Sequence, residues 1–239
     1  MSSIRVVHTA NVHSLQTHTD LIREFVFQCK DSSSFKFRAG QFLMLNLTNP
    51  AGGKDILRAY SLASGEQDPK LFRLLIKYIP QGIASEFFWN LKQGDEIRFT
   101  GPFGKLFFPE PPKSHLFFMS TGSGLAPHMS YIETFLEKYP NKQFEFLIGV
   151  RTQNDFFMQS YLEDKKSRFK NFNFQFVLSR PDDQWSGRCG YLQHQINSLG
   201  FEKSDCQFFI CGNEDMAKDS KNCLLEQGLS ADQIFVEIF

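Results

Sequence analysis

The sequence of 239 residues lacks the cysteine spacings that bind metals. Its five cysteines, Cys29, Cys189, Cys206, Cys211 and Cys223, form no CxxC pair and no CxxxxCxxC run. Zinc ribbons and plant-type iron–sulfur clusters need such spacings, so we expect neither and predict no metal site. An odd number of cysteines at irregular intervals also argues against a disulfide framework.

An excess of charge and a long apolar run are missing as well. Lys and Arg number 26, and Asp and Glu also number 26, so no basic surface predicts binding to nucleic acid or to an anionic membrane. Apolar runs such as 116–119 and 208–211 are far shorter than the roughly 20 residues of a membrane-spanning helix. Residues 1–10 hold no apolar signal segment. We therefore expect a cytoplasmic protein without a membrane span.

The two halves of the chain differ in their pattern of elements. Up to about Phe108, short β-branched and aromatic runs alternate with turns, which is typical of an antiparallel barrel of about six strands. One helix interrupts this half, predicted over 85–92 with Ser85 as its N-cap. Residues 109–113, PEPPK, can continue neither a strand nor a helix. We predict a barrel domain over 1–108, a linker over 109–113 and a second domain over 114–239.

After the linker, apolar runs alternate with helical stretches, which indicates βαβ units and a parallel sheet. The predicted strands are 115–120, 144–150, 172–178, 207–211 and 233–239, and the predicted helices are 127–139, 155–168, 192–199 and 216–227. The 36 Phe, Tyr and Trp side chains are expected to build most of the core. His8, His13, His18 and His128 are expected to be scattered surface residues.

Two segments of the first half contain candidate binding residues. On a strand, Arg58 and Tyr60 share one face and Ser61 lies on the other, so this strand can offer a guanidinium and a ring to a flat, phosphorylated ligand. A surface arginine on an ordinary strand is the alternative. Gly82 and Ser85 lie at the start of the predicted helix, where N–H groups favour an anion, although a plain serine cap explains them equally.

Two further segments of the second half lie at predicted strand ends. Residues 120–127, STGSGLAP, follow a strand and open a helix, so Gly122 and Gly124 would let the backbone approach a pyrophosphate. Pro127 stands where GxGxxG has its last glycine and suits the first turn of a helix. A simple βα turn is the alternative. Residues 211–213, CGN, and 237–239, EIF, would border the same crevice, unless they are an inert thiol and a frayed terminus.

In this order, the segments RAYSLAS, GIAS, GDEIRFTGPFGKLFF, STGSGLAP, CGN and EIF resemble the ferredoxin–NADP(+) reductase family over essentially the whole chain. This family includes bacterial ferredoxin and flavodoxin reductases, oxygenase reductases and free-flavin reductases. The resemblance implies a flavin-binding six-stranded barrel followed by an α/β nucleotide-binding domain. The implied cofactors are FAD and, as hydride donor, NADPH or NADH.

The resemblance also implies roles for individual residues. Arg58 would bind the flavin phosphate, Tyr60 would stack on the isoalloxazine ring and Ser61 would lie near its reactive nitrogen. The rest of the flavin set is Ala59, Leu75, Ile76 and Lys77, with Gly82, Ile83, Ala84 and Ser85 at the FAD pyrophosphate. The nicotinamide nucleotide set is Thr121, Gly122, Gly124, Pro127, Cys211 and Gly212. Ser61, Cys211, Glu237 and Phe239 are the candidate catalytic residues, with positioning and polarity roles.

Phe239 matches the aromatic residue that covers the flavin in this family, although plant-type members have Tyr there. Ser179 and Arg180 resemble the pair that binds the 2′-phosphate in NADPH-dependent members, and Arg188 and Tyr191 could join them. Residues 185–191 also resemble a stretch of NADH-using members. Both coenzymes therefore stay open.

The leading hypothesis is an FAD-dependent NAD(P)H oxidoreductase that passes electrons to a separate acceptor, such as ferredoxin, flavodoxin or an oxygenase component. One alternative is an NAD(P)H:flavin reductase that releases reduced flavin. Another is a non-catalytic, flavin-binding electron-relay subunit. Acceptor docking depends on surface charge that no motif encodes, and no motif encodes the oligomeric state.

Overall fold

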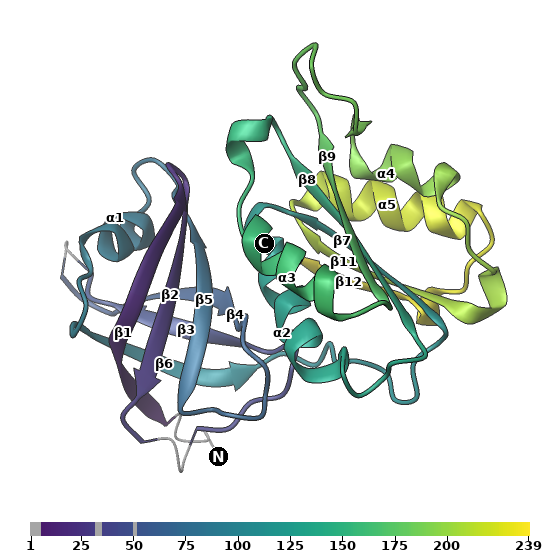
Figure 1. Ribbon diagram of the computed structural model, residues 1–239. Coiled ribbons are helices and arrows are strands. Elements are labelled where there is room, and N and C mark those ends of the chain that lie inside the picture. Colours follow the sequence, from purple (N-terminus) through teal and green to yellow (C-terminus); the bar gives the residue numbers. More distant parts are fainter. Residues whose placement is uncertain (1–5, 32–34, 50–51) are drawn as a thin grey trace. The chain divides into compact units, whose positions relative to one another are not determined.

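The chain forms two compact units in the computed structural model, which describes residues 6–31, 35–49 and 52–239 (Figure 1). The first unit consists of Met1–Phe107 and Met129–Thr134, and the second of Phe108–His128 and Phe135–Phe239. The domain bounds at 108, 113 and 114 stay a prediction, and residues 1–5 of the predicted barrel lie outside the described residues. Within the described ranges, no helix is both long and apolar enough to span a membrane.

Six strands of the first unit make one antiparallel sheet in the order β4-β3-β6-β1-β2-β5. Its elements are β1 (Val7–Thr19), β2 (Ile22–Cys29), β3 (Phe42–Leu47), β4 (Ile56–Ser61), β5 (Leu71–Lys77), α1 (Ile83–Asn90) and β6 (Glu96–Phe103). Leu62, just after the edge strand β4, forms an isolated antiparallel bridge with Leu74 of the other edge strand, β5. The six-stranded antiparallel fold is confirmed, but in the described chain no continuous ladder of hydrogen bonds closes it into a barrel.

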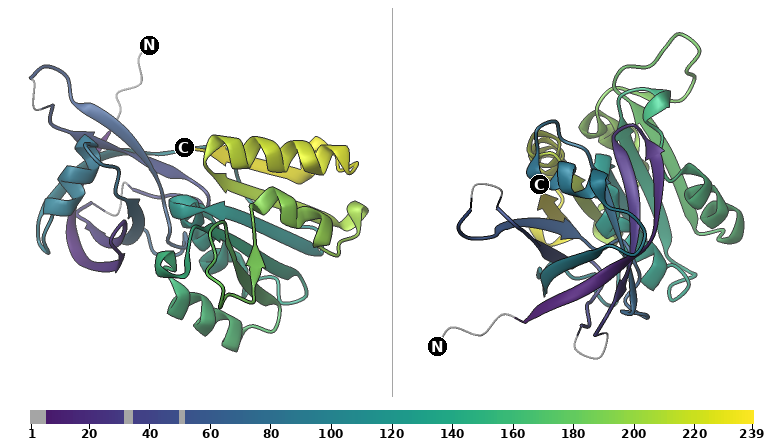
Figure 2. Two further views of the ribbon diagram at one scale, coloured as in Figure 1. Left: turned by 90° about the horizontal axis from the view of Figure 1, so that it is seen from above. Right: turned by 90° about the vertical axis from the view of Figure 1, so that its left-hand side faces the viewer.

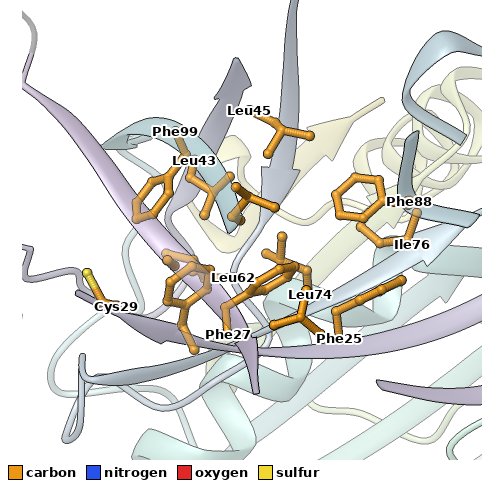
Figure 3. Close-up of a cluster of buried hydrophobic side chains, with 14 of the residues drawn as sticks. Phe25, Phe27, Cys29, Leu43, Leu45, Leu62, Leu74, Ile76, Phe88 and Phe99 are labelled. Atoms are coloured by element: carbon orange, nitrogen blue, oxygen red, sulfur yellow. The ribbon is translucent and has the colours of Figure 1, made fainter. Parts of the chain in front are cut away.

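Large rings fill the core of this sheet. Side chains from β2, β3, β5, β6 and α1 point toward one another, with Phe25, Phe88 and Phe99 among them (Figure 3). The rings of Phe25 and Phe88 are 5.3 Å apart. Burying a phenylalanine stabilises a fold by roughly 1.5–3 kcal/mol, so Phe88, together with the buried Ala84, anchors the short α1 on the sheet.

The second unit is built on a parallel six-stranded sheet in the order β10-β9-β8-β7-β11-β12. Its strands are β7 (His115–Thr121), β8 (Gln143–Val150), β9 (Phe172–Leu178), β10 (Arg188–Cys189), β11 (Cys206–Gly212) and β12 (Ile234–Ile238). Its α-helices are α3 (Gln159–Arg168), α4 (Leu192–Gln195) and α5 (Glu214–Glu226), and α2 (Leu125–Phe135) contributes residues to both units. Its short 3₁₀ turns are η1 (Gly122–Gly124), η2 (Gln153–Asp155), η3 (Ile196–Ser198), η4 (Lys203–Asp205) and η5 (Ala231–Gln233). Helices α4 and α5 lie on one face of the sheet and α3 on the other (Figure 2). The predicted α/β architecture is confirmed.

A row of phenylalanines crosses this parallel sheet. The strand register aligns Phe235, Phe209, Phe118, Phe146 and Phe174 on five neighbouring strands. Neighbouring rings stack at 4.8 Å between Phe209 and Phe235, 4.8 Å between Phe118 and Phe209, and 4.3 Å between Phe118 and Phe146. Alternation along each strand places these rings on one face, so the abundance of phenylalanine is largely a property of the core.

The histidines are not all surface residues, so that prediction was wrong for two of them. His8 is 6% exposed and packs on Phe35 and Phe99. His128, on α2, is 2% exposed and meets the ring of Phe118 at 5.4 Å. Burial lowers the pKa of His128 to about 3, so it is neutral at physiological pH. The inward face of α2 depends on packing that the sequence around Pro127 does not reveal.

Candidate functional site

The edge strand β4 presents the first group of candidate residues. Arg58 and Ala59 are exposed, while Tyr60 and Ser61 are half-buried. The Tyr60 ring meets Phe88 of α1 edge-on at 5.1 Å, which ties it to the core. Burial raises the pKa of Tyr60 to about 12, although the positive charge of Arg58 lowers it in part. Tyr60 is therefore a neutral, anchored ring beside an exposed guanidinium.

The N-terminus of α1 has no side-chain cap. Ser85, predicted to be that cap, lies within the helix, and its Oγ accepts a hydrogen bond from the Ile79 N–H at 2.8 Å. The prediction was wrong because this hydroxyl closes the turn before the helix instead. A Cβ on Gly82 would come within 2.9 Å of the Ile79 carbonyl oxygen, so this turn requires glycine. The first N–H groups of α1, at Ile83 and Ala84, have no acceptor within the helix, and such groups at a helix start favour an anion.

The other edge strand, β5, carries the remaining residues of the flavin set. Leu75 and Ile76 are 3% and 1% exposed, and Lys77 is exposed. Both buried side chains pack inside the protein, so they can meet a ligand chiefly through backbone atoms. An edge strand leaves alternate backbone groups without a strand partner on one side, which suits such contacts.

In the second unit, the glycine-rich segment forms the turn between β7 and α2. Gly122 has φ +54°, in the left-handed region that favours glycine. A Cβ on Gly124 would lie 2.2 Å from the carbonyl oxygen of Cys211 and 2.6 Å from its carbonyl carbon. Gly124 is therefore required by the close approach of the turn to β11. Pro127 is the third residue of α2, in its first turn as predicted.

The carboxyl ends of three strands bring a second group together. The register of β7, β11 and β12 aligns Ser120, Cys211 and Glu237. Cys211 is 1% exposed, and burial, with a contribution from the Glu237 charge, raises the pKa of its thiol well above the usual range. An uncharged, buried thiol suits a polarity role better than a nucleophilic one. Phe239 is 61% exposed, and its backbone N–H donates to the Gly212 carbonyl oxygen at 3.3 Å.

The two arginines predicted near a 2′-phosphate differ in their surroundings. Arg180 follows β9, its backbone N–H donates to the Arg151 carbonyl oxygen at 2.8 Å, and its side chain is exposed. In the described part of the chain, the Arg180 guanidinium has no hydrogen-bond acceptor. Ser179 is half-buried beside it, and its N–H donates to the Val150 carbonyl oxygen.

The guanidinium of Arg188, by contrast, is engaged within the unit. Its Nε donates to Gln175 Oε1 at 2.5 Å, and its Nη1 donates to Gln195 Oε1 at 3.2 Å and to Ser198 Oγ at 2.6 Å. Tyr191, which the sequence grouped with it, is 61% exposed. The structure thus separates a tethered arginine from an exposed one.

Sequence reasoning missed the part that Asn213 plays at this end of the sheet. Its Oδ1 accepts from the Met216 N–H at 2.9 Å, which makes it the N-cap of α5. Its own N–H and its Nδ2 donate to Thr121 Oγ1 at 3.2 and 3.3 Å. An asparagine just before a helical stretch is a recognisable cap signal, but its contact with Thr121 crosses 92 positions of sequence.

Comparison with known proteins bears on both units. The oxidoreductase FAD-binding domain model matches residues 10–108, and the oxidoreductase NAD-binding domain model matches residues 118–222. Ferredoxin–NADP reductase B of Sorangium cellulosum is 31% identical over 215 residues, which cover 87% of this chain and 86% of that protein. One component of the Na(+)-translocating NADH-quinone reductase of Neisseria meningitidis is 29% identical over 200 residues, or 77% of this chain. This chain spans only 49% of that component's length.

Among solved structures, a ferredoxin–NADP(+) reductase from Neisseria gonorrhoeae with bound FAD and NADP has a TM-score of 0.85 and 25% identity. The match covers 97% of this chain and 98% of that one. The two domain models and this structural similarity assign the chain to oxidoreductases that use FAD and a nicotinamide nucleotide as cofactors. The chain belongs to the ferredoxin–NADP reductase-like family of NAD(P)H-dependent flavoprotein reductases.

Proposed function

We propose that this protein passes electrons from a nicotinamide nucleotide through bound FAD to a separate acceptor protein, such as ferredoxin, flavodoxin or an oxygenase component. The observation that carries the proposal is the row of Ser120, Cys211 and Glu237 at the carboxyl ends of neighbouring parallel strands. Ligands of open α/β sheets bind at such strand ends, and the adjacent glycine-rich turn opens a helix, as pyrophosphate sites do.

In the first unit, Arg58, Tyr60 and the uncapped start of α1 fit the parts of FAD. The guanidinium suits a phosphate, the anchored ring suits the isoalloxazine, and the N–H groups of Ile83 and Ala84 suit the pyrophosphate. We propose that Ala59, Ser61, Leu75, Ile76, Lys77, Gly82 and Ser85 line the same site. Bound FAD supplies the conversion of a two-electron donor into electrons for an acceptor, while the chain supplies position and electrostatics.

In the second unit, we propose that the nicotinamide nucleotide is held by Thr121, Gly122, Gly124, Pro127, Cys211 and Gly212, with Glu237 and Phe239 near its reactive end. The buried, uncharged thiol of Cys211 fits the uncharged dihydronicotinamide ring of the reduced nucleotide, because the thiol offers polarity without a competing reaction. NADPH and NADH are both retained as donors. Arg180 is the candidate for a 2′-phosphate, since its guanidinium is exposed whereas Arg188 is tethered.

The test is an anaerobic visible spectrum of the purified protein, before and after addition of NADPH or NADH. A bound flavin that one nucleotide bleaches within seconds supports the proposal and identifies the coenzyme. A colourless protein that reduces added FAD or FMN would favour the free-flavin reductase instead. A bound flavin that neither nucleotide reduces would refute the proposal and favour the electron-relay subunit. The cytoplasmic location remains a prediction from the sequence.

A further inference from the structure

We propose that Asn213 is a positioning residue that makes the Thr121 hydroxyl a hydrogen-bond donor to an acceptor oxygen of the bound nicotinamide nucleotide. The inference rests on the proposed function, because it specifies the chemistry of that nucleotide site. It concerns the contact between the end of β7 and the start of α5.

The orientation of the Asn213 amide is set by the helix that it caps. Its Oδ1 accepts from the Met216 N–H at 2.9 Å, and only an oxygen can take that place. The NH₂ end of the amide is therefore the end that faces Thr121 Oγ1, at 3.3 Å. Capping α5 and presenting a donor to Thr121 are two consequences of one orientation.

Counting donors and acceptors then assigns a role to the Thr121 hydroxyl. A hydroxyl oxygen accepts two hydrogen bonds and donates one. Both acceptor positions of Thr121 Oγ1 are filled by Asn213, one by its backbone N–H at 3.2 Å and one by its Nδ2. No residue of the described ranges accepts the remaining proton, and Thr121 is only half-buried. The hydroxyl can thus bind a ligand only as a donor.

The surrounding backbone holds the hydroxyl in this place. A Cβ on Gly212 would lie 2.1 Å from Thr121 Oγ1, so the hydroxyl sits directly against the end of β11. The ligand atom that it meets must be an acceptor, either an oxygen of the pyrophosphate or the carbonyl oxygen of the nicotinamide carboxamide. An amide NH₂ is excluded at this position, because two donors would face each other.

Four variants test the inference: N213D, T121V, T121S and the double variant N213D/T121V. An aspartate caps a helix as well as an asparagine does, but its second oxygen would face Thr121 as an acceptor and take the hydroxyl proton. Asn213 is exposed, so N213D opens no cavity and should keep the wild-type melting temperature within a few degrees. T121S retains the hydroxyl and serves as the conservative control.

The readout is the dissociation constant of NADP⁺ and of NAD⁺, measured by calorimetry on the FAD-loaded protein. We expect N213D and T121V each to weaken binding roughly 10-fold and T121S to remain near wild type. The dissociation constant of the double variant should be at most about 2-fold higher than that of T121V, because T121V already lacks the hydroxyl proton that N213D would divert. ADP-ribose, or its 2′-phosphate if NADP⁺ binds better, identifies the acceptor. This ligand keeps the pyrophosphate and lacks the nicotinamide carboxamide. If N213D still weakens its binding, the acceptor is a pyrophosphate oxygen; if N213D no longer weakens its binding, the acceptor is the carboxamide oxygen.

Three results would overturn the inference. One is wild-type affinity in N213D. Another is an equal loss from N213D in the wild-type and T121V backgrounds, which would mean that charge repulsion alone weakens binding. The third is a wild-type protein that binds neither nucleotide, which would refute the proposed function as well, whereas the first two results leave that function standing.

Discussion

Replacing Gly124 by alanine should damage the second unit, because the added methyl group meets backbone. It would lie 2.2 Å from the carbonyl oxygen of Cys211, whereas real Cβ contacts are essentially never under 3.0 Å. The turn or β11 must therefore move by about 0.8 Å or more. All seven residues of β11 are buried, so the strand has little room to yield. Overpacking of this kind costs about 1–3 kcal/mol of unfolding free energy.

The same shift should weaken nucleotide binding, since the displaced turn carries Thr121 and Gly122. A misplacement of about 1 Å in a binding element can cost on the order of 100-fold in activity. We expect G124A to retain FAD and to show a kcat/KM for NAD(P)H that is lower by about 10- to 100-fold. Urea unfolding and steady-state reduction of a dye acceptor measure the two effects.

The matched control is Gly200→Ala. Gly200 belongs to the same unit, and a Cβ there would meet nothing within 4 Å. G200A should therefore leave kcat/KM unchanged and alter the unfolding free energy by less than about 1 kcal/mol. If G124A and G200A behave alike in both assays, the packing argument for Gly124 is wrong.

Three further predictions concern other parts of the chain. The double variant R58A/Y60A should lose stoichiometric FAD, read from the ratio of flavin to protein absorbance after gel filtration, and full retention would refute the proposed roles of both residues. His128 stays neutral when folded, with a pKa of about 3, while the unfolded chain takes up its proton below about pH 6.5, so stability should fall by about 2–3 kcal/mol from pH 7 to 4.5. H128L should remove most of that slope in urea titrations at the two pH values, and an unchanged slope would place its cause elsewhere. For Glu24, burial would raise the pKa, but the hydrogen bond from His18 and the charge of Arg73 outweigh it and lower the pKa, so its contribution is present at neutral pH and lost in acid. E24Q should lower the unfolding free energy by about 3 kcal/mol at pH 7, because it removes the negative charge that faces Arg73. An unshifted urea midpoint would show that solvent replaces this interaction.

Local sequence signals predicted most elements because the relevant forces act within a few residues. The strand predicted over 172–178 is β9 as observed, since its alternating apolar pattern needs no distant partner to be recognised. The helix predicted to begin at 155 begins at Gln159 instead. Asp155 closes a separate 3₁₀ turn, where its carboxylate accepts from the Thr152 N–H and hydroxyl, each at 2.9 Å. An acidic residue before an apolar run fits either use, so sequence alone did not separate them.

The predicted site residues also differ in whether local sequence signals could place them. Motifs predict Thr121, Cys211 and Glu237 as site residues. The structure aligns Cys211 and Glu237 on neighbouring parallel strands and has Thr121 at the end of β7, because strand ends of a parallel sheet converge when the strands lie in register. The tethering of Arg188 was not foreseeable, because its three acceptors come from β9, α4 and η3. Side-chain partners across different elements depend on packing distances that no spacing rule encodes.

By itself, the sequence determined the succession of an antiparallel and a parallel sheet and the family, and it predicts the segments that would meet the cofactors. Periodicity, turn residues and motif order carry that information locally. Only the tertiary structure decided why Gly124 must be glycine, that His128 is buried and neutral, and that Asn213 directs the Thr121 hydroxyl. Each of these depends on atoms that are remote in sequence and a few ångströms apart in space. Burial and hydrogen-bond pairing respond to that proximity and not to order along the chain.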